Sequence, residues 1–336
     1  MKKRGQVTVF LIIGLVILIS FGIFYYAKSY NTKSAIKNAL KKTASETDIV
    51  KAYVEACIKN VAEEALFEKI GEQGGYIDVN ANPKYGEKGV AGSQISPAYI
   101  SFQGKNVPYY LEAYCEEIYC SQYAACPVPP CPCIKQKCRS WGYKEYTPTL
   151  DAISKKLANY IAVEFEDCFN KNIFEDIGIR IEKPVVDYQA INFDFSRGNA
   201  NVEVNFNEED ISIKLTYPLI IRKADAKSML DSFIVFLPIR LKSLFEGSKD
   251  LVADMKSQIE GLSDTDYLSD APFSIAQSDC PTYVRNDLTN LYTKTAADNS
   301  KIMQFVDFST YYNYYVNSHI FQFAVKNIKI EGNCVG

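Results

Sequence analysis

Histidine is almost absent from this chain, since His319 is the only one among 336 residues. A Ser-His-Asp triad could form only through this residue, and its position at the edge of an apolar strand predicts a structural role instead. The sequence also lacks a phosphate-binding loop, a dinucleotide-binding fingerprint, a His-Glu-x-x-His pattern and a Gly-x-Ser-x-Gly elbow. We therefore expect no catalytic residues, no cofactor and no enzymatic activity.

A charge excess of either sign is missing as well. The 37 basic and 40 acidic residues leave a net charge of −3. Because binding to nucleic acid depends on a basic surface, we expect no nucleic-acid partner. Hydrophobic residues make up 47% of the chain, which is typical of a folded protein.

Cysteine pairs with the spacing of a zinc knuckle are a third absence. Six of the ten cysteines lie between residues 115 and 138, but none of them form a Cys-x2-Cys pair and no histidine is nearby. We therefore predict disulfides in this segment and no metal site, and the sequence leaves their pairing open. The six residues are Cys115, Cys120, Cys126, Cys131, Cys133 and Cys138.

What the chain does have is a long apolar segment without charge, at residues 7–27. At about 1.5 Å per residue in a helix, it is long enough to cross the roughly 30 Å hydrocarbon layer of a membrane. It predicts a transmembrane anchor with the lipid bilayer as a partner. Basic residues flank the segment on both sides, but the heavy use of cysteine favours an oxidising exterior. We therefore expect a single-pass protein of the cell membrane with a cytoplasmic N-terminus and an extracytoplasmic body.

The stretch Lys2-Lys3-Arg4-Gly5, followed by Gln6-Val7-Thr8-Val9-Phe10, resembles an archaeal class III signal sequence of type IV pilin-like proteins. The resemblance implies that a prepilin-type peptidase cuts between Gly5 and Gln6 and leaves the apolar helix on the mature protein. Gln6 and Thr8 fit the family pattern, whereas Phe10 stands at its acidic position and Gly14 at its leucine position. Because the family uses the acidic residue to orient subunits in a filament, the resemblance points to processing more than to filament assembly.

Three later stretches, at residues 53–77, 107–110 and 321–325, resemble uncharacterised single-span surface proteins of small-genome archaea. This second resemblance implies a general layout and supplies no activity.

We expect three regions along the chain. The first, residues 1–30, holds the charged segment and the anchor. The second, residues 31–177, holds a stalk helix at about 32–42 and two paired helices with a Cys-rich insertion between them. The third, residues 178–336, holds an antiparallel sheet with a helical insertion.

The two paired helices are predicted from apolar residues that recur every three or four positions, within residues 44–70 and 148–168. Cys57 and Cys168 both lie on the apolar faces of these helices. We therefore predict that the helices pack together and that the two cysteines form a disulfide.

The pattern changes to a period of two between residues 178 and 223, which predicts an antiparallel meander with one buried face. Residues 224–260 return to a helical pattern that Pro238 interrupts, and a short helix is expected near 283–291. Strands at 302–308 and 320–330 are expected to join the sheet of the meander, with Cys280 bonded to Cys334. The predicted fold class is α+β: a long transmembrane and stalk helix, then a disulfide-rich domain whose meander packs on amphipathic helices.

A group of four tyrosines between the last two strands fits either a recognition surface or the packing of a β-hairpin. These residues are Tyr311, Tyr312, Tyr314 and Tyr315.

Together, these features predict a membrane-anchored, exported interaction protein whose partners are other surface proteins or further copies of itself. Two alternatives stay open: a subunit of a type IV pilus, and an envelope enzyme or assembly factor for exported proteins.

Overall fold

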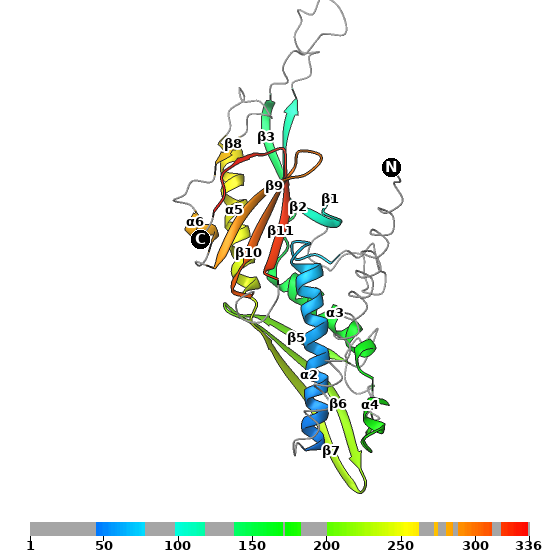
Figure 1. Ribbon diagram of the computed structural model, residues 1–336. Coiled ribbons are helices and arrows are strands. Elements are labelled where there is room, and N and C mark those ends of the chain that lie inside the picture. Colours follow the sequence, from blue (N-terminus) through cyan, green and yellow to red (C-terminus); the bar gives the residue numbers. More distant parts are fainter. Residues whose placement is uncertain are drawn as a thin grey trace, which may run out of the picture. The chain divides into compact units, whose positions relative to one another are not determined.

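The structure is a computed structural model, shown in Figure 1. It describes residues 45–77, 98–117, 138–170, 172–182, 200–261, 272–274, 280–284, 288–310 and 317–334. These residues form two compact units that are interleaved along the chain. Of the described residues, the small unit contains those within 45–56, 172–182 and 218–231, and the large unit contains the others.

Two long helices occupy the regions where the sequence predicts paired helices. Helix α2 (Glu46–Glu64) follows Ser45 and runs without a break into a π-helix, η1 (Ala65–Ile70). Helix α3 (Leu150–Cys168) starts two residues later than the sequence suggests. The reason is that Thr149 caps it: the Thr149 hydroxyl accepts a hydrogen bond from the amide of Ala152 at 3.1 Å.

The main sheet of the large unit has the strand order β1-β2-β11-β10-β9, with β3 paired to β2. All its pairs are antiparallel except β11 with β2, which is parallel. Figure 1 shows β9, β10 and β11 side by side. The strands are β1 (Tyr99–Phe102), β2 (Lys105–Glu117), β3 (Cys138–Glu145), β9 (Thr289–Thr295), β10 (Lys301–Asp307) and β11 (His319–Lys326).

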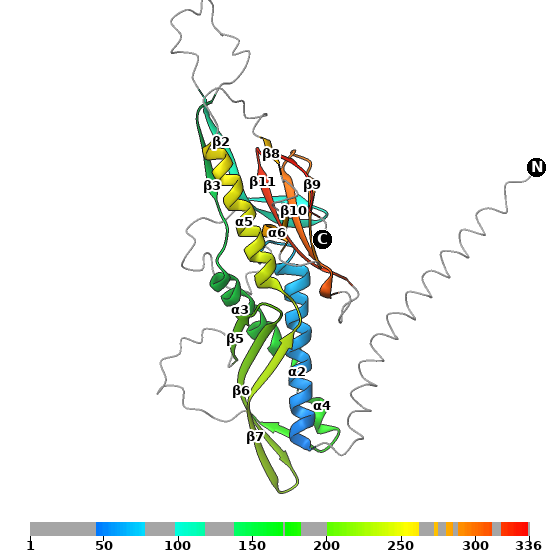
Figure 2. The same cartoon turned by 90° about the vertical axis from the view of Figure 1, so that its left-hand side faces the viewer.

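Aromatic side chains fill the core between this sheet and helix α5 (Leu241–Glu260), which packs against β2, β3, β10 and β11 and lies along the sheet in Figure 2. Tyr110 stacks on Phe323 with ring centroids 4.4 Å apart. Phe245 of α5 meets Phe321 edge-on at 6.2 Å. These four rings are buried, so α5 covers the apolar face of the sheet and holds it away from water.

A second sheet is built around β6 (Ile211–Lys223), whose alternate residues are buried along most of its length. In the large unit, β5 (Asn201–Phe206) pairs with residues 211–216 of β6, and α3 packs on β5 through a hydrogen bond from the Ser154 hydroxyl to the Val204 carbonyl, at 2.7 Å. Strand β7 (Ala226–Leu237) also pairs with β6.

In the small unit, β4 (Arg180–Glu182) pairs with residues 220–222 of β6. The ring of Phe174, in the short helix α4 (Asn172–Glu175), lies edge-on to that of Tyr53 at 5.1 Å. A Lys223–Glu46 ion pair at 2.9 Å links the end of β6 to the start of α2.

Three short elements complete the described chain. Strands β8 (Pro272–Ser274) and β12 (Lys329–Glu331) form a parallel pair, and the four-residue helix α6 (Cys280–Tyr283) packs on α5.

The structure corrects the predicted fold class. None of the helices in the described ranges is long and apolar enough to cross a membrane, and the residues of the predicted anchor and stalk, within 1–44, lie outside those ranges. The last strands do not join the meander, because β10 and β11 pair with β9 and β2 in the separate main sheet. The described residues therefore form a mixed α/β protein with several sheets and one parallel pairing within the main sheet.

The predicted helix over residues 224–260 is also wrong in its first half, which forms strand β7. Phe233, Val235 and Leu237 are buried, whereas Ile234 and Phe236 between them are 49% and 62% exposed. This alternation is that of a strand, and the run of β-branched and aromatic residues favours it. The short helix expected near 283–291 is likewise replaced by α6 and the start of β9. The division into a small and a large unit does not test the predicted region boundaries at residues 30 and 177, which stay predictions.

Candidate functional site

The largest concentration of buried polar side chains in the described chain lies in the large unit, where β9, β10 and β11 meet the start of α5. We call it the Asp307 cluster. Its members are Arg240, Thr289, Asp307, Ser309, Thr310 and His319.

An ion pair between Arg240 and Asp307 forms the centre of the cluster. Arg240 occupies the N-cap position of α5, and Asp307 is the last residue of β10. The Arg240 Nε donates to Asp307 Oδ2 at 3.2 Å, and its Nη2 donates to Asp307 Oδ1 and to the Thr289 hydroxyl. The two side chains are only 6% and 0% exposed. Such a buried pair must keep all its partners, because an unpaired buried charge is costly.

The turn after β10 adds further hydrogen-bond donors to Asp307. Ser309 donates to Asp307 Oδ1 from its backbone amide at 2.9 Å and from its hydroxyl at 2.6 Å. The Thr310 hydroxyl donates to the carbonyl of Asp307 and accepts from the amide of His319, both at 2.8 Å. Thr310 thus links the end of β10 to the start of β11, where Asp307 and His319 are paired in the ladder.

His319 is fully buried and extends the cluster to the π-helix η1. Its Nε2 lies 3.1 Å from the carbonyl oxygen of Leu66. Because a carbonyl oxygen can only accept, Nε2 carries the hydrogen. Nδ1 is then an acceptor, and no group in the described chain donates to it. Complete burial lowers the pKa of His319 below its usual range, an effect that the negative charge of Asp307 and the bond to Leu66 oppose.

Gly71, directly after η1, lets this segment approach β11 closely. A Cβ atom at Gly71 would lie 2.3 Å from the carbonyl oxygen of Ile320 and 2.9 Å from His319 Nε2. The Gly71 carbonyl accepts from the amide of Gln322 at 2.9 Å, and the Gln322 side chain donates to the carbonyl of Glu72 at 2.8 Å. The first part of the glycine-rich stretch 71–75 therefore docks the end of the α2–η1 helix onto β11.

A second perturbed group, Lys156, lies where α3 meets the chain after this stretch. Its Nζ is 4.3 Å from the ring centroid of Tyr76, a cation–π contact. Burial lowers the pKa of Lys156 to about 8. This contact joins α3 to the segment that follows η1.

The geometry of the Asp307 cluster suits a structural junction and not nucleophilic catalysis. The Ser309 hydroxyl donates to Asp307, whereas a triad needs it to donate to histidine. His319 Nε2 is bonded to a backbone carbonyl, and the histidine has no exposed surface for a substrate. The cluster holds η1, β9, β10, β11 and α5 together.

We expect the free energy of unfolding to fall as the pH drops from about 7 to about 5. The unfolded chain binds a proton at His319 near pH 6.5, whereas the folded chain binds it only at a lower pH. Between the pKa of His319 in the unfolded chain and its lower pKa in the folded chain, the unfolded state binds more protons, so acid destabilises the fold. The other charged groups of the cluster, Arg240 and Asp307, are held in their ion pair.

The chain has no second histidine, so His319→Gln should flatten this part of the pH profile. Urea-unfolding midpoints of the wild type and the variant, measured across this pH range, make the comparison. An equal loss of stability in both proteins would assign the effect to other groups.

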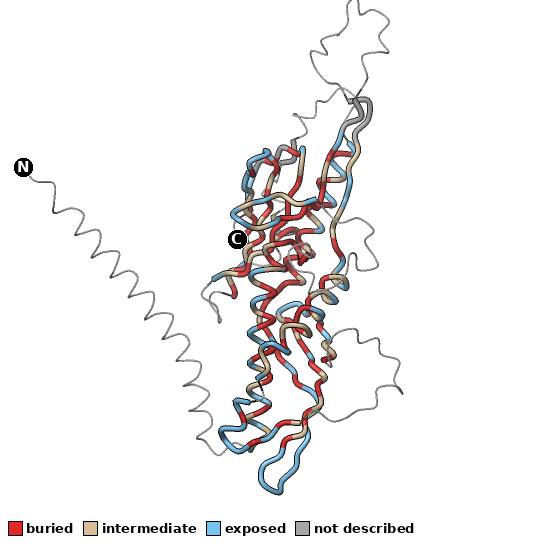
Figure 3. Tube along the Cα trace, turned by 90° about the vertical axis from the view of Figure 1, so that its right-hand side faces the viewer, coloured by how far each residue is buried: buried red, intermediate tan, exposed pale blue. Residues whose placement is uncertain are grey.

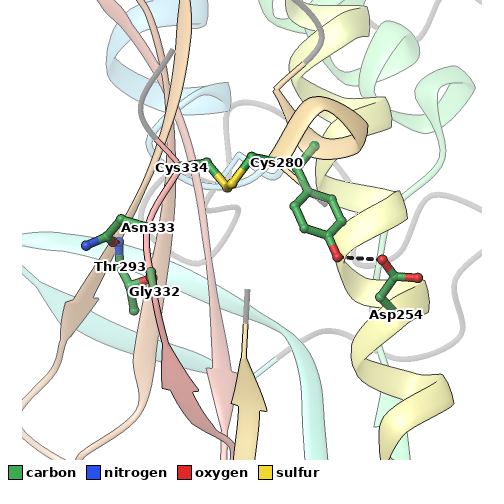
Figure 4. Close-up of a disulfide and its surroundings, with 7 residues drawn as sticks. Asp254, Cys280, Thr293, Gly332, Asn333 and Cys334 are labelled. Atoms are coloured by element: carbon green, nitrogen blue, oxygen red, sulfur yellow. Dashed lines mark hydrogen bonds between the residues drawn. A yellow bond between two sulfur atoms is a disulfide. The ribbon is translucent and has the colours of Figure 1, made fainter. Parts of the chain in front are cut away.

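Both long-range disulfides that the sequence predicts are present. Cys57 is bonded to Cys168 across 111 residues, and Cys280 to Cys334 across 54 residues. Figure 4 shows that the second bridge ties α6 to the chain after β12. There, Cys334 also exchanges backbone hydrogen bonds with Leu291 of β9. Both predictions are confirmed, since these cysteines come together as expected.

The other predicted site residues are not described with their side chains. Gly5, Gln6 and the four tyrosines at 311–315 lie outside the described residues, as do four of the six clustered cysteines. For the remaining two cysteines only the backbone is described: in the β2–β3 ladder, Cys115 pairs with Trp141, and Cys138 pairs with Glu117. The first and the last of the six cysteines therefore lie on two paired strands.

The sequence analysis missed the Arg240–Asp307 pair. Residues 303, 305 and 307 are all buried in β10, so Asp307 follows Met303 and Phe305 on the core face. An acidic residue at a buried strand position requires a cation or several donors, and this is the signal that could have found it. Its partner is 67 residues away, and no local pattern connects the two.

Comparison with known proteins yields no relative: no family model, no curated protein and no solved structure matches the chain.

Proposed function

We propose that this chain is an exported protein whose disulfide-stabilised body binds other surface components outside the cytosol. The observation that carries the proposal is the pair of disulfides, Cys57–Cys168 and Cys280–Cys334. Every cysteine whose side chain is described is bonded in this way. Structural disulfides persist in oxidising compartments and are rare in a reducing cytosol.

The finer localisation, a single-pass protein with its N-terminus inside, is supported by sequence alone. Residues 7–27 and the processing site between Gly5 and Gln6 lie outside the described residues. The Asp307 cluster offers no nucleophile to a substrate, because Ser309 and His319 are buried and bonded to other groups. We therefore propose no catalytic activity.

The test is the intact mass of the native protein after alkylation of free thiols, before and after reduction. We expect no alkylated cysteine before reduction, ten after it, and a mature chain that starts at Gln6. A Cys57→Ala variant provides the matched control, because it should expose one thiol, that of Cys168. Alkylation of all ten cysteines before reduction would rule out an exported, oxidised body.

A further inference from the structure

Strand β7 has one edge without a partner in the described chain. It pairs with β6 and with no other described strand. Residues 226–229 and 231 are exposed, and Figure 3 shows this end of the β6–β7 hairpin in the exposed colour. An unpaired strand edge offers a row of backbone donors and acceptors to another chain.

The exposed side chains of this edge are also apolar to an unusual degree. Three of the seven large apolar side chains that the described chain exposes belong to β7: Met229, Ile234 and Phe236. Met229, at 62% exposed, lies nearest the turn of the hairpin. Met229 is the one of these three that lies in the part of β7 where the neighbouring residues are also exposed, and an open edge strand can receive another strand by β-augmentation.

The charges of β7 are arranged symmetrically around Met229. Lys227 and Asp231 are the two charged residues of the strand. They lie two positions before and two positions after Met229, so all three side chains project from the same face. Neither Lys227 nor Asp231 forms an ion pair with another described residue.

This arrangement is complementary to itself in one antiparallel register. When two copies of β7 pair around Met229, each Lys227 lies opposite Asp231 of the other copy, and the two methionines face each other. A register centred on residue 227 would instead oppose two lysines, and one centred on residue 231 would oppose two aspartates. Opposite charges across a ladder stabilise it and like charges destabilise it, so charge selects the Met229 register.

We propose that β7 is a self-association edge, through which two copies of this chain pair antiparallel around Met229. The contact is isologous, since the same surface serves both copies. Because the ladder is short, the interface belongs to the weak, transient class. The inference rests on the proposed function, since it names a second copy as one partner of the interaction protein.

The first experiment is disulfide trapping of the full chain with Met229→Cys under mild oxidation. Directly opposed residues in an antiparallel pair have Cβ atoms about 4.5–5.5 Å apart, so we expect a covalent dimer. Ile234→Cys is the matched control: it is exposed on the same strand, but in this register its two copies are about 34 Å apart. It should stay monomeric, and a monomeric Met229→Cys protein would overturn the proposal.

The second experiment reverses the charges in the Met229→Cys background. With Lys227→Asp alone, each of the two copies places an aspartate at residue 227 opposite Asp231 of the other copy. Two like-charged pairs then replace two opposite-charged pairs, and we expect trapping to slow at least tenfold. Adding Asp231→Lys exchanges the two charges and should restore the original rate. If the single reversal has no effect, or the double reversal does not restore trapping, the register is wrong and the proposal fails.

The outcome for β7 is separable from the outcome for the proposed function. Alkylation of the wild-type protein reports on export and disulfides whether or not β7 pairs. A monomeric protein without free thiols would remove the self-association edge alone, whereas free thiols would remove the proposed function.

Discussion

Replacing Asp307 with alanine is expected to lower the free energy of unfolding by about 3–5 kcal/mol. The carboxylate is fully buried and accepts from the guanidinium of Arg240 and from the amide and hydroxyl of Ser309. Its removal leaves the Arg240 charge buried without a counter-ion and strips the turn after β10 of its acceptor. Urea unfolding of the wild type and the variant near neutral pH measures the difference.

Two further variants separate the buried charge from the loss of a side chain. Arg240→Met combined with Asp307→Leu removes both charges, and it should recover most of the stability lost in Asp307→Ala. Lys155→Ala breaks the exposed pair with Asp151, whose side chains are 64% and 72% exposed, and should cost only about 0.5 kcal/mol. A loss for Asp307→Ala no larger than that for Lys155→Ala would mean that the ion pair does not hold the junction.

The second large effect is expected from the Cys57–Cys168 bridge. Replacing both cysteines with alanine frees a loop of 111 residues, and the chain-entropy model assigns about 4–5 kcal/mol to that loss of constraint. Cys57 is also buried, so its truncation adds a small packing loss. Unfolding in guanidinium chloride without reductant gives the comparison with the wild type.

A reducing buffer provides the control for the bridge. With its disulfides reduced, the wild type should fall to the stability of the double variant treated in the same way, because both chains then lack the constraint. If a difference of several kcal/mol persisted under reduction, packing around Cys57 and not the cross-link would be its cause.

These two effects concern the same part of the large unit. The bridge joins the middle of α2, at Cys57, to the last residue of α3, Cys168. Helix α2 continues into η1, whose Leu66 carbonyl contacts His319 of the Asp307 cluster. Nearby, Gly71 and Gln322 join the chain after η1 to β11. A covalent link at Cys57 and a buried polar junction at Leu66 therefore both hold the α2–η1 helix.

Local patterns predicted several parts of the fold correctly. The three-to-four-residue spacing of apolar side chains identified α2 and α3, and the placement of Cys57 and Cys168 on apolar faces identified their bond. The alternation in β5 and β6 identified two strands of the second sheet. Each periodic signal is contained within one element, and the disulfide follows from comparing two such elements.

The same reasoning failed at β7, where Met229, Phe233, Phe236 and Leu237 fit a helical stripe as well as a strand. Short apolar runs are ambiguous in this way. Pairing with β6 decided the outcome, since it satisfies the backbone of residues 226–237 as a strand. The exposure of Met229 and Phe236 follows from that tertiary choice.

The sequence by itself determined the helices α2 and α3, the partners in the Cys57–Cys168 and Cys280–Cys334 bridges, and the approximate positions of β4, β5, β6, β10 and β11. Periodicity and cysteine placement are local or pairwise properties. Only the tertiary structure decided that β11 lies parallel to β2 and that Asp307 forms an ion pair with Arg240. Strand neighbours and buried ion pairs depend on which distant surfaces exclude water together, and that is a property of the whole packed core.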